Sequence, residues 1–240
     1  MSKTKFKWNW KYLDPFYPYD LFVKYLEKNN ITNKYFNFLI FLIYAFVLAY
    51  IILKILALIL GGHQAAMIVV SGSMQHYLEI GDIAVLGSPK TIDTTYITID
   101  KNIKGQPLNN YLSVNYTLQN NQFIIKDLNV SGAIVDLNKQ GDVVVYYSPL
   151  QKKEIIHRAV LGIKANDGTF YLTKGDNENT NFVLDADCDF ALQTPQGTIK
   201  VQCLYPYALQ KENILSKYWF DIPYLGWIKL GPAYLFGWRA

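Results

Sequence analysis

A long apolar stretch near the N-terminus constrains this chain more than any other feature. Every residue from Phe38 to Leu53 is apolar or tyrosine, and after Lys54 the run continues from Ile55 to Leu60. At about 1.5 Å of rise per residue, a helix over this stretch crosses the ~30 Å hydrocarbon core of a bilayer. A cleaved signal peptide has a shorter apolar region, and so long a run is rare in a soluble core. We therefore expect a retained transmembrane helix over residues 36–60.

The charges before this stretch predict its orientation. Lysines outnumber carboxylates there: Lys3, Lys5, Lys7, Lys11, Lys24, Lys28 and Lys34 against Asp14, Asp20 and Glu27. Because a lysine-rich flank stays in the cytoplasm, we expect residues 1–35 inside and residues 61–240 outside the cell membrane. The N-terminal segment also carries an aromatic cluster and a helical apolar stripe, which favour contact with the inner membrane surface or packing against a partner. These residues are Trp8, Trp10, Tyr12, Phe16, Tyr17 and Tyr19, then Leu21, Phe22, Tyr25 and Leu26.

Composition narrows the classes of function. The 240-residue chain has 18% charged and 15% aromatic residues, which suits a protein that meets lipid. Its net charge is only +4, with lysines gathered near the N-terminus, so nucleic-acid binding is disfavoured. Cys188 and Cys203 lack CxxC spacing and neighbouring histidines, so we expect neither a metal nor a cofactor. Outside the membrane the two cysteines form either a disulfide or two buried thiols, and the sequence leaves both open.

After Leu60 the pattern changes to short β-type runs separated by turn residues. The runs are Ala66 to Val70, Ile83 to Leu86, Phe123 to Ile125, Asp142 to Tyr147, Ile155 to Ile163 and Thr169 to Thr173. They predict a mainly antiparallel β domain over residues 61–240. Residues 88–140 alternate more weakly and predict a β-rich insertion or a loop system. The apolar tail 222–240 is too short for a second span, so it forms either core strands with a frayed end or a contact with the outer leaflet.

Three motifs in this domain carry side chains suited to nucleophilic catalysis. Ser71-Gly-Ser-Met74 follows an apolar run and presents a hydroxyl on a tight turn. Such a hydroxyl needs a base, and among the histidines only His157 lies in a strand pattern. Leu172-Thr-Lys-Gly-Asp-Asn177 then offers a carboxylate to orient the imidazole. Each motif also has a purely structural interpretation, because these residues are common in turns and buried histidines find partners for structural reasons.

Taken in order, these motifs resemble signal peptidase I. The resemblance covers roughly Met67 to Asp187 and includes Gly81-Asp82, Gly141-Asp-Val-Val-Val145, Ile156-His-Arg158 and, near the end, Ile222-Pro-Tyr-Leu-Gly-Trp227. Bacterial members have lysine where this chain has His157, so the similarity is to the archaeal and endoplasmic-reticulum branch. It implies a signal-peptidase-type β fold anchored by one helix and a serine endopeptidase that removes signal peptides. The implied partners are those signal peptides, membrane lipid and the protein-export machinery.

The resemblance also implies roles for individual residues. Ser73 would be the nucleophile, His157 the general base, and the Ser71 hydroxyl with the Ser73 backbone N–H the oxyanion donors. The orienting acid stays open, because relatives carry a second aspartate six residues after the first, where this chain has Phe182. Asp176 and Asp185 are therefore joint candidates, with Asp187 behind them. The substrate would lie as an extended strand beside Ala66, Met67, Ile68, Val69 and Val70 on one side and Glu154, Ile155 and Ile156 on the other.

Two other functions compete with this one. The self-cleaving transcriptional repressors share a distant form of the catalytic fold, but they are soluble and rely on lysine. A membrane-tethered β domain that binds a partner or scaffolds a complex would use Ser73, His157 and Asp176 only as turn and core residues. A serine-reactive probe separates the hypotheses, because it labels an enzyme at Ser73 and ignores a scaffold.

Overall fold

The computed structural model describes residues 14–29, 31, 33–119, 122–194, 197–200, 203–235 and 237. The chain divides into two compact units, Met1–Leu56 and Ala57–Ala240. Of the predicted N-terminal aromatic cluster, Trp8, Trp10 and Tyr12 lie outside the described residues.

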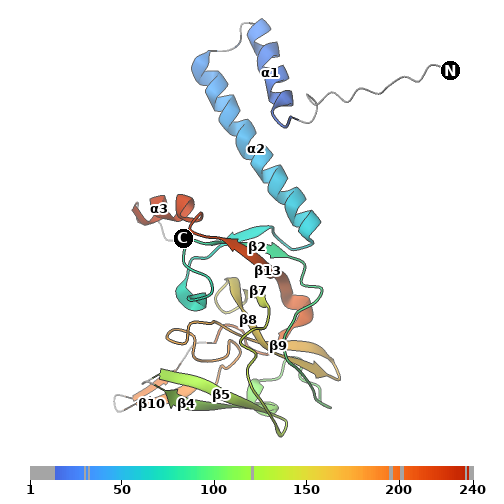
Figure 1. The fold of residues 1–240 in the computed structure, drawn as a ribbon, viewed down its shortest axis with the longest axis vertical. Helices are drawn as coiled ribbons and strands as arrows, with labels where there is room; N and C mark the ends of the chain where they lie inside the picture. Colours follow the sequence, from blue (N-terminus) through green and yellow to red (C-terminus); the bar gives the residue numbers. More distant parts are fainter. Residues whose placement is uncertain are drawn as a thin grey trace, which may run out of the picture. The chain divides into compact units, whose positions relative to one another are not determined.

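Two helices make up the described part of the N-terminal unit. α2 (Lys34–Leu60) contains the predicted span and is long and apolar enough to cross a membrane. Ala57 is its only buried residue, so α2 is not the core helix of a soluble domain. α1 (Tyr17–Lys28) folds back beside the first half of α2 (Figure 1). The rings of Tyr19 and Tyr44 lie 5.4 Å apart between centroids, and the Tyr44 hydroxyl donates to the Pro15 carbonyl oxygen.

The β domain is built on one large sheet, which confirms the prediction of a mainly antiparallel β fold (Figure 1). Its hydrogen-bonded order is β1 (Ala66–Ile68), β2 (Ile83–Gly87), β13 (Ile214–Ile222), β7 (Val143–Ser148), β8 (Lys153–Ala165), β9 (Gly168–Lys174) and β12 (Leu209–Gln210). All neighbours in this order are antiparallel, and β3 (Tyr96–Thr98) adds one parallel pairing to β8. Five of the six predicted runs fall in this sheet, because alternating apolar residues mark strands with one face on a core.

The stretch 88–140 contributes strands of its own and part of the main core. β4 (Leu112–Gln119), β5 (Gln122–Val130) and β6 (Ala133–Val135) form an antiparallel sheet. Leu128 of β5 packs in one buried cluster with Leu161 of β8 and Phe170 of β9. The segment is therefore a β-rich element packed against the main sheet.

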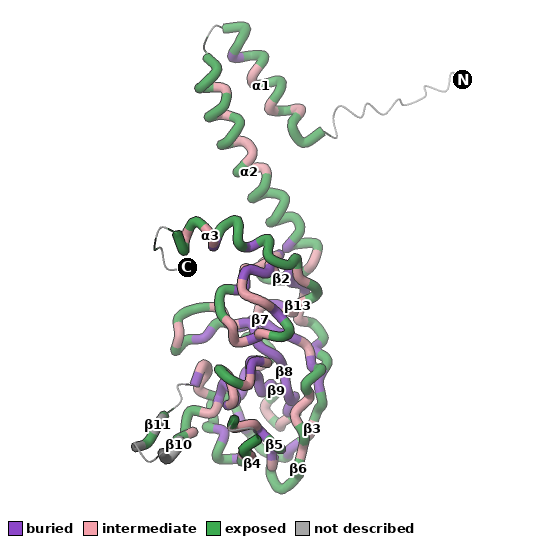
Figure 2. The backbone as a smooth tube through the Cα atoms, turned by 60° about the vertical axis from the view of Figure 1, so that its left-hand side comes forward, coloured by how far each residue is buried: buried purple, intermediate pink, exposed green. Residues whose placement is uncertain are grey.

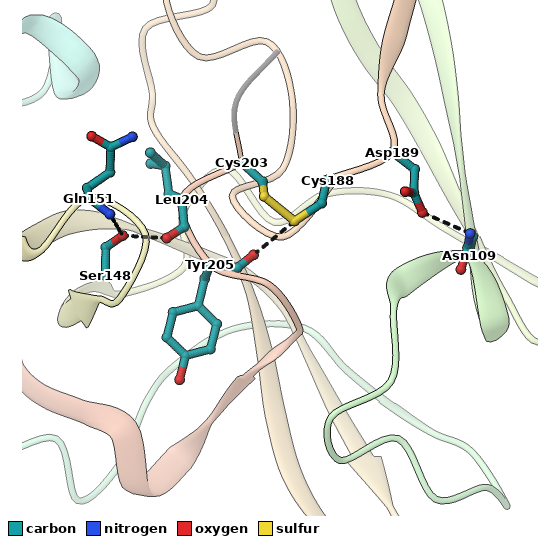
Figure 3. The surroundings of a disulfide bond; sticks show 8 residues. All are labelled: Asn109, Ser148, Gln151, Cys188, Asp189, Cys203, Leu204 and Tyr205. Carbon is teal, nitrogen blue, oxygen red and sulfur yellow. Dashed lines mark hydrogen bonds between the residues drawn. A yellow bond between two sulfur atoms is a disulfide. The ribbon is translucent and has the colours of Figure 1, made fainter. Parts of the chain in front are cut away.

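A disulfide closes a small hairpin in the C-terminal half. β10 (Ala191–Thr194) and β11 (Gly197–Lys200) pair with each other, and Cys188 is bonded to Cys203 just outside them (Figure 3). Of the two alternatives that the sequence left open, a disulfide or two free thiols, the structure has the disulfide.

The apolar tail forms a turn and a helix, not the core strands that were one of the two alternatives. β13 of the main sheet ends at Ile222, where the tail begins, and the chain continues into α3 (Trp227–Leu235), which the sequence did not predict. The Trp227 indole N–H donates to the Ile80 carbonyl oxygen at 3.0 Å and anchors the start of the helix. Gly81 must lack a side chain here, because its φ is +96° and a Cβ would lie 2.1 Å from the Trp227 ring nitrogen. Most of α3 beyond this anchor is exposed (Figure 2).

Candidate active site

The predicted nucleophile lies on a tight turn at the end of β1. Val69 continues the pairing of β1, because its N–H donates to the Asp82 carbonyl oxygen at 2.9 Å. Ser71 is still extended, and a short 3-10 turn then covers Gly72–Met74. The fully buried Met74 side chain anchors this turn in the core, while Ser73 stays half-buried. The turn therefore presents the Ser73 hydroxyl to a cleft.

The Gly175-Asp-Asn177 turn after β9 binds backbone carbonyl oxygens of the turn that carries Ser73. The Asn177 backbone N–H donates to the Ser73 carbonyl oxygen at 3.0 Å, and its side-chain amide donates to the Gly72 carbonyl oxygen at 2.8 Å. Gly175 lies so close that an added Cβ would be 2.6 Å from the Ser73 carbonyl oxygen. Asn177 appeared in the sequence motif without a role, and the structure shows that it fixes the serine turn.

His157 joins the serine to a carboxylate. It lies on β8 with 2% of its surface exposed. Its Nε2 is 3.0 Å from Ser73 Oγ, and its Nδ1 is 2.9 and 2.8 Å from the two carboxylate oxygens of Asp185. With Asp185 ionised, Nδ1 carries the proton and donates it to the carboxylate, which leaves Nε2 to accept from the serine hydroxyl.

Asp185 is buried but remains ionised because donors surround it. Burial alone would raise the pKa of its carboxyl, but His157 and the hydroxyls of Thr173 and Tyr146 outweigh this effect and hold the pKa below its ordinary value. The Tyr146 hydroxyl donates to Asp185 at 2.9 Å. Burial, together with the Asp185 charge, raises the pKa of Tyr146 well above its ordinary value, so this hydroxyl keeps its proton.

The other candidate acids lie elsewhere. Asp176 forms a two-pronged ion pair with Arg158, with its oxygens 2.9 Å from Nε and 2.6 Å from Nη2. Arg158 follows His157 on the strand and therefore points to the opposite face, which takes Asp176 away from the imidazole. Asp187 accepts a hydrogen bond from the Tyr116 hydroxyl at 2.8 Å. Of the joint candidates, only Asp185 contacts His157.

Ser71 and a buried lysine complete the polar surroundings of the turn. The hydroxyl of Ser71, the predicted second oxyanion donor, lies 3.4 Å from that of Ser73. Lys174, the last residue of β9, is buried. Its ammonium group donates to the Gly175 carbonyl oxygen at 2.9 Å and pairs with Glu178.

A cleft of about 210 Å³ runs past the Ser73 hydroxyl. Its lining includes seven of the eight predicted substrate-binding residues: Met67, Ile68, Val69, Val70, Glu154, Ile155 and Ile156. Ala66 is not in the lining. It pairs with Val85 of β2 at the far end of β1. Gln151, Lys153, Asn181 and Leu204 also line the cleft, and the sequence did not predict them.

Both long walls of the cleft are open strand edges within the described residues. β1 pairs only with β2, at one end of the sheet. β8 pairs with β7 from Lys153 onward, but its pairing with β9 begins only at Arg158. The first residues of β8 therefore leave backbone donors and acceptors free to bind an extended peptide.

Sequence reasoning missed the second layer of the site. Tyr146 and Thr173 both donate to Asp185, and neither had a predicted role, although Thr173 lies in the Leu172-Thr-Lys-Gly-Asp-Asn177 motif. For Tyr146 the available signal was the two-residue period of a strand, which places Tyr146 on the same face of β7 as Val144, in the core. Nothing in a single sequence indicates that the distant Asp185 packs against this face.

The chain matches no protein-family model, and no curated protein is significantly similar to it in sequence.

Proposed function

We propose that this protein is a membrane-anchored serine endopeptidase of the signal-peptidase type that removes N-terminal signal peptides from exported preproteins. One observation carries the proposal. Ser73 Oγ lies 3.0 Å from His157 Nε2, and His157 Nδ1 lies 2.8 Å from the buried Asp185 carboxylate, beside a cleft with two open strand edges. A hydroxyl, an imidazole and a carboxylate in this order are the groups that activate a serine for acyl transfer.

The proton follows the hydrogen bonds already present. As Ser73 Oγ attacks the scissile carbonyl carbon, His157 Nε2 takes the hydroxyl proton and then delivers it to the leaving amine. Asp185 keeps the imidazole in the required tautomer and stabilises its positive charge. Water then repeats the sequence on the acyl-enzyme and releases the second product.

Developing negative charge on the carbonyl oxygen needs donors beside the nucleophile. The Ser73 backbone N–H and the Ser71 hydroxyl take this role. A preorganised donor of this kind contributes ~3 kcal/mol to transition-state stabilisation. The 3.4 Å separation of the two hydroxyls supports the assignment, because the oxyanion forms next to the attacked carbon.

The shape of the cleft supports an extended substrate with small side chains. A peptide added between β1 and the start of β8 would bond both open edges through its backbone, which makes binding general. A volume of about 210 Å³ is small for a ligand pocket, so selectivity comes from rejecting bulky side chains near the cut.

Membrane anchoring would bring the cleft to the substrate. Ser73 follows Leu60 by thirteen residues, so an extended connection keeps it within ~45 Å of the end of α2. A signal peptide leaves its apolar segment in the bilayer and its cleavage site just outside, so tethering raises the effective concentration of the protease there. The disulfide supports the outward orientation that the lysine asymmetry predicts, because disulfides persist in oxidising compartments.

The C-terminal end of the domain supports a second contact with the outer leaflet. Its exposed apolar side chains, which we call the C-terminal apolar face, are Trp219, Phe220, Ile222, Tyr224, Leu225, Trp227, Ile228, Tyr234 and Leu235. Aromatic residues with polar ring atoms favour the interface between lipid and water. Soluble domains rarely expose so many large apolar side chains together unless the surface binds something.

A non-catalytic scaffold explains less of the geometry. It accounts for a buried His157–Asp185 pair, since buried polar groups are normally satisfied. It gives no reason for that pair to meet a serine hydroxyl at the wall of a cleft.

The test is processing of a model preprotein by membranes that contain the full chain. We expect cleavage when alanine occupies the first and third positions before the cut, and little cleavage when phenylalanine occupies them. Ser73→Ala and His157→Ala abolish cleavage, whereas the matched controls Ser113→Ala and His63→Ala, at exposed positions, leave it intact. Equal cleavage by the Ser73→Ala membranes would overturn the proposal, and so would failure of the native chain to cut either substrate.

A further inference from the structure

The Cys188–Cys203 disulfide joins two segments that both belong to the proposed site. Asp185 precedes Cys188 by three residues, and Leu204 directly follows Cys203. The backbone N–H groups of Leu204 and Tyr205 both donate to the Asp185 carbonyl oxygen, at 2.8 and 3.0 Å. The crosslink therefore lies at the junction between the orienting carboxylate and the chain that follows the hairpin.

The same junction reaches the wall of the cleft. Leu204 lines the cleft, and its carbonyl oxygen accepts a hydrogen bond from the Ser148 hydroxyl at 2.5 Å. That hydroxyl also accepts from the Gln151 backbone N–H at 3.0 Å, and Gln151 lines the cleft too (Figure 3). Leu204 and Gln151, two of the four lining residues that the sequence did not predict, are thus linked to the crosslink through Ser148.

Little regular structure holds this junction otherwise. Residues 185–188 and 203–205 belong to no strand or helix. Asp185 is fixed by its N–H bond to the Thr173 carbonyl oxygen at 2.9 Å and by the donors to its side chain. The crosslink is the only covalent restraint that ties this segment to the cleft wall among the described residues.

Stapling of the hairpin alone does not explain the position of the disulfide. β10 and β11 already pair through four residues, from Ala191↔Lys200 to Thr194↔Gly197. The disulfide lies beyond the Ala191↔Lys200 pair, at the open end of the hairpin and toward Asp185. Cys188 precedes Ala191 by three residues, and Cys203 follows Lys200 by three. Its restraint therefore acts mainly on the junction.

We infer that the Cys188–Cys203 crosslink is a positioning element of the site, which holds the Asp185 carboxylate against His157 and Leu204 in the wall of the cleft. The inference rests on the proposed function. It makes the reactivity of Ser73 sensitive to reduction. Cys188 is exposed, so the thiolate of a dithiol reductant can attack its sulfur, open the disulfide and then close on itself. Two electrons pass to the protein, which gains two thiols, and the reductant becomes a cyclic disulfide.

The test compares three states of the full chain in detergent: oxidised, reduced with dithiothreitol, and the variant Cys188→Ser/Cys203→Ser. The first readout is the His157 Nδ1–H proton resonance, observed with ¹⁵N-histidine and identified by its loss in His157→Gln. The chain has only three histidines, so the spectrum is simple. The second readout is the rate at which a peptidyl phosphonate ending in alanine phosphonylates Ser73.

Reduction should weaken both signals while the β domain stays folded. The resonance moves upfield or broadens, because Asp185 no longer holds the proton in one geometry. The labelling rate falls roughly tenfold or more, since small misplacements of catalytic groups are costly. The double cysteine variant shows the lower rate before any reductant is added and does not respond to it.

A further comparison separates positioning from general loosening. In an Asp185→Asn background, breaking the crosslink should change the labelling rate by less than about twofold, because both changes act through the same carboxylate. An equal drop in both backgrounds would overturn the inference. So would an unchanged resonance and rate in fully reduced, folded protein, or unfolding of the whole β domain on reduction. A native chain that shows the resonance but never reacts at Ser73 overturns the proposed function instead, and the resonance alone then decides the role of the crosslink.

Discussion

Asp185 and Asp176, which the sequence offered equally as the orienting acid, make different contacts. Asp185 receives the imidazole N–H, whereas Asp176 neutralises Arg158, whose guanidinium also lies 4.4 Å from the Tyr77 ring centroid. In the proposed mechanism the first carboxylate orients the base, whereas the second joins β8 to the Gly175-Asp-Asn177 turn through Arg158.

Substitution of the two aspartates should therefore give opposite patterns. Asp185→Asn removes the anion that selects the productive tautomer, and we expect turnover to fall by a factor on the order of 10³–10⁴ with the fold retained. Asp176→Asn leaves a buried guanidinium without its anion, so it lowers the unfolding free energy by a few kcal/mol but leaves most turnover in the folded fraction. Preprotein processing rates and chemical denaturation of both variants check this. A larger loss of turnover in Asp176→Asn than in Asp185→Asn would show that Asp185 is not the orienting acid.

The lowered pKa of Asp185 also makes stability depend on pH. A carboxyl whose pKa is lower in the folded state than its unfolded value of about 3.9 stabilises the fold above that value. This contribution is lost as the pH falls through the folded-state pKa. We expect the difference in unfolding free energy between the native chain and Asp185→Asn to shrink as the pH falls below about 4. Denaturation followed by circular dichroism between pH 5 and pH 3 measures it, and a difference that grows over this range would contradict the assignment.

Among the structural elements, the nucleophile turn depends on the turn that follows β9. The Asn177 backbone N–H donates to the Ser73 carbonyl oxygen, and Gly175 leaves no room for a Cβ beside the same oxygen. The Gly175-Asp-Asn177 turn therefore fixes the position of the serine turn. The glycine and the asparagine of the Gly175-Asp-Asn177 motif therefore support the serine turn, whether or not the motif supplies the orienting carboxylate.

Gly175→Ala should displace Ser73 without removing any side chain from the hydrophobic core. Its new Cβ would lie 2.6 Å from a backbone oxygen, so the turn must move and turnover should fall roughly tenfold to hundredfold. Gly231→Ala in α3 is the matched control, because nothing lies within 4 Å of the added Cβ. Equal activity of the two variants would show that the serine turn does not need this support.

Five strands of the main sheet could be predicted from their short apolar runs, but β3, β12, β13 and several other elements could not. β4 and β6 carry polar or exposed residues, and their pairing depends on neighbours remote in sequence. α3 contains Gly231 and Pro232, which normally mark turns, and it is short. The acid stayed ambiguous because the loop after Asn177 sets which carboxylate returns to His157, and loop length alone does not determine that path.

At the scale of the whole molecule, the chain combines a membrane-compatible helix with a β domain that carries the cleft. Among the described residues, α2 and the C-terminal apolar face both expose many large apolar side chains. In the proposed function both contact lipid while the protein cleaves its substrate.

The C-terminal apolar face can be tested with two isoleucines of similar exposure. Ile228 on α3 is 76% exposed and Ile134 on β6 is 72% exposed. Ile228→Asp should slow preprotein processing in membranes several-fold, because burying a carboxylate in the interface is costly, while Ile134→Asp should not. Labelling of Ser73 in detergent should be the same in both. If Ile228→Asp processes as fast as Ile134→Asp in membranes, this face does not contact lipid during the reaction.

The most direct test of the central claim is to locate the covalent adduct formed by a peptidyl phosphonate on the full-length chain. Peptide mass spectrometry should find one adduct, on Ser73, in the native chain and in His63→Ala, and almost none in His157→Ala. An unmodified Ser73 in the native chain, or a Ser73 that reacts equally well without His157, would contradict the account.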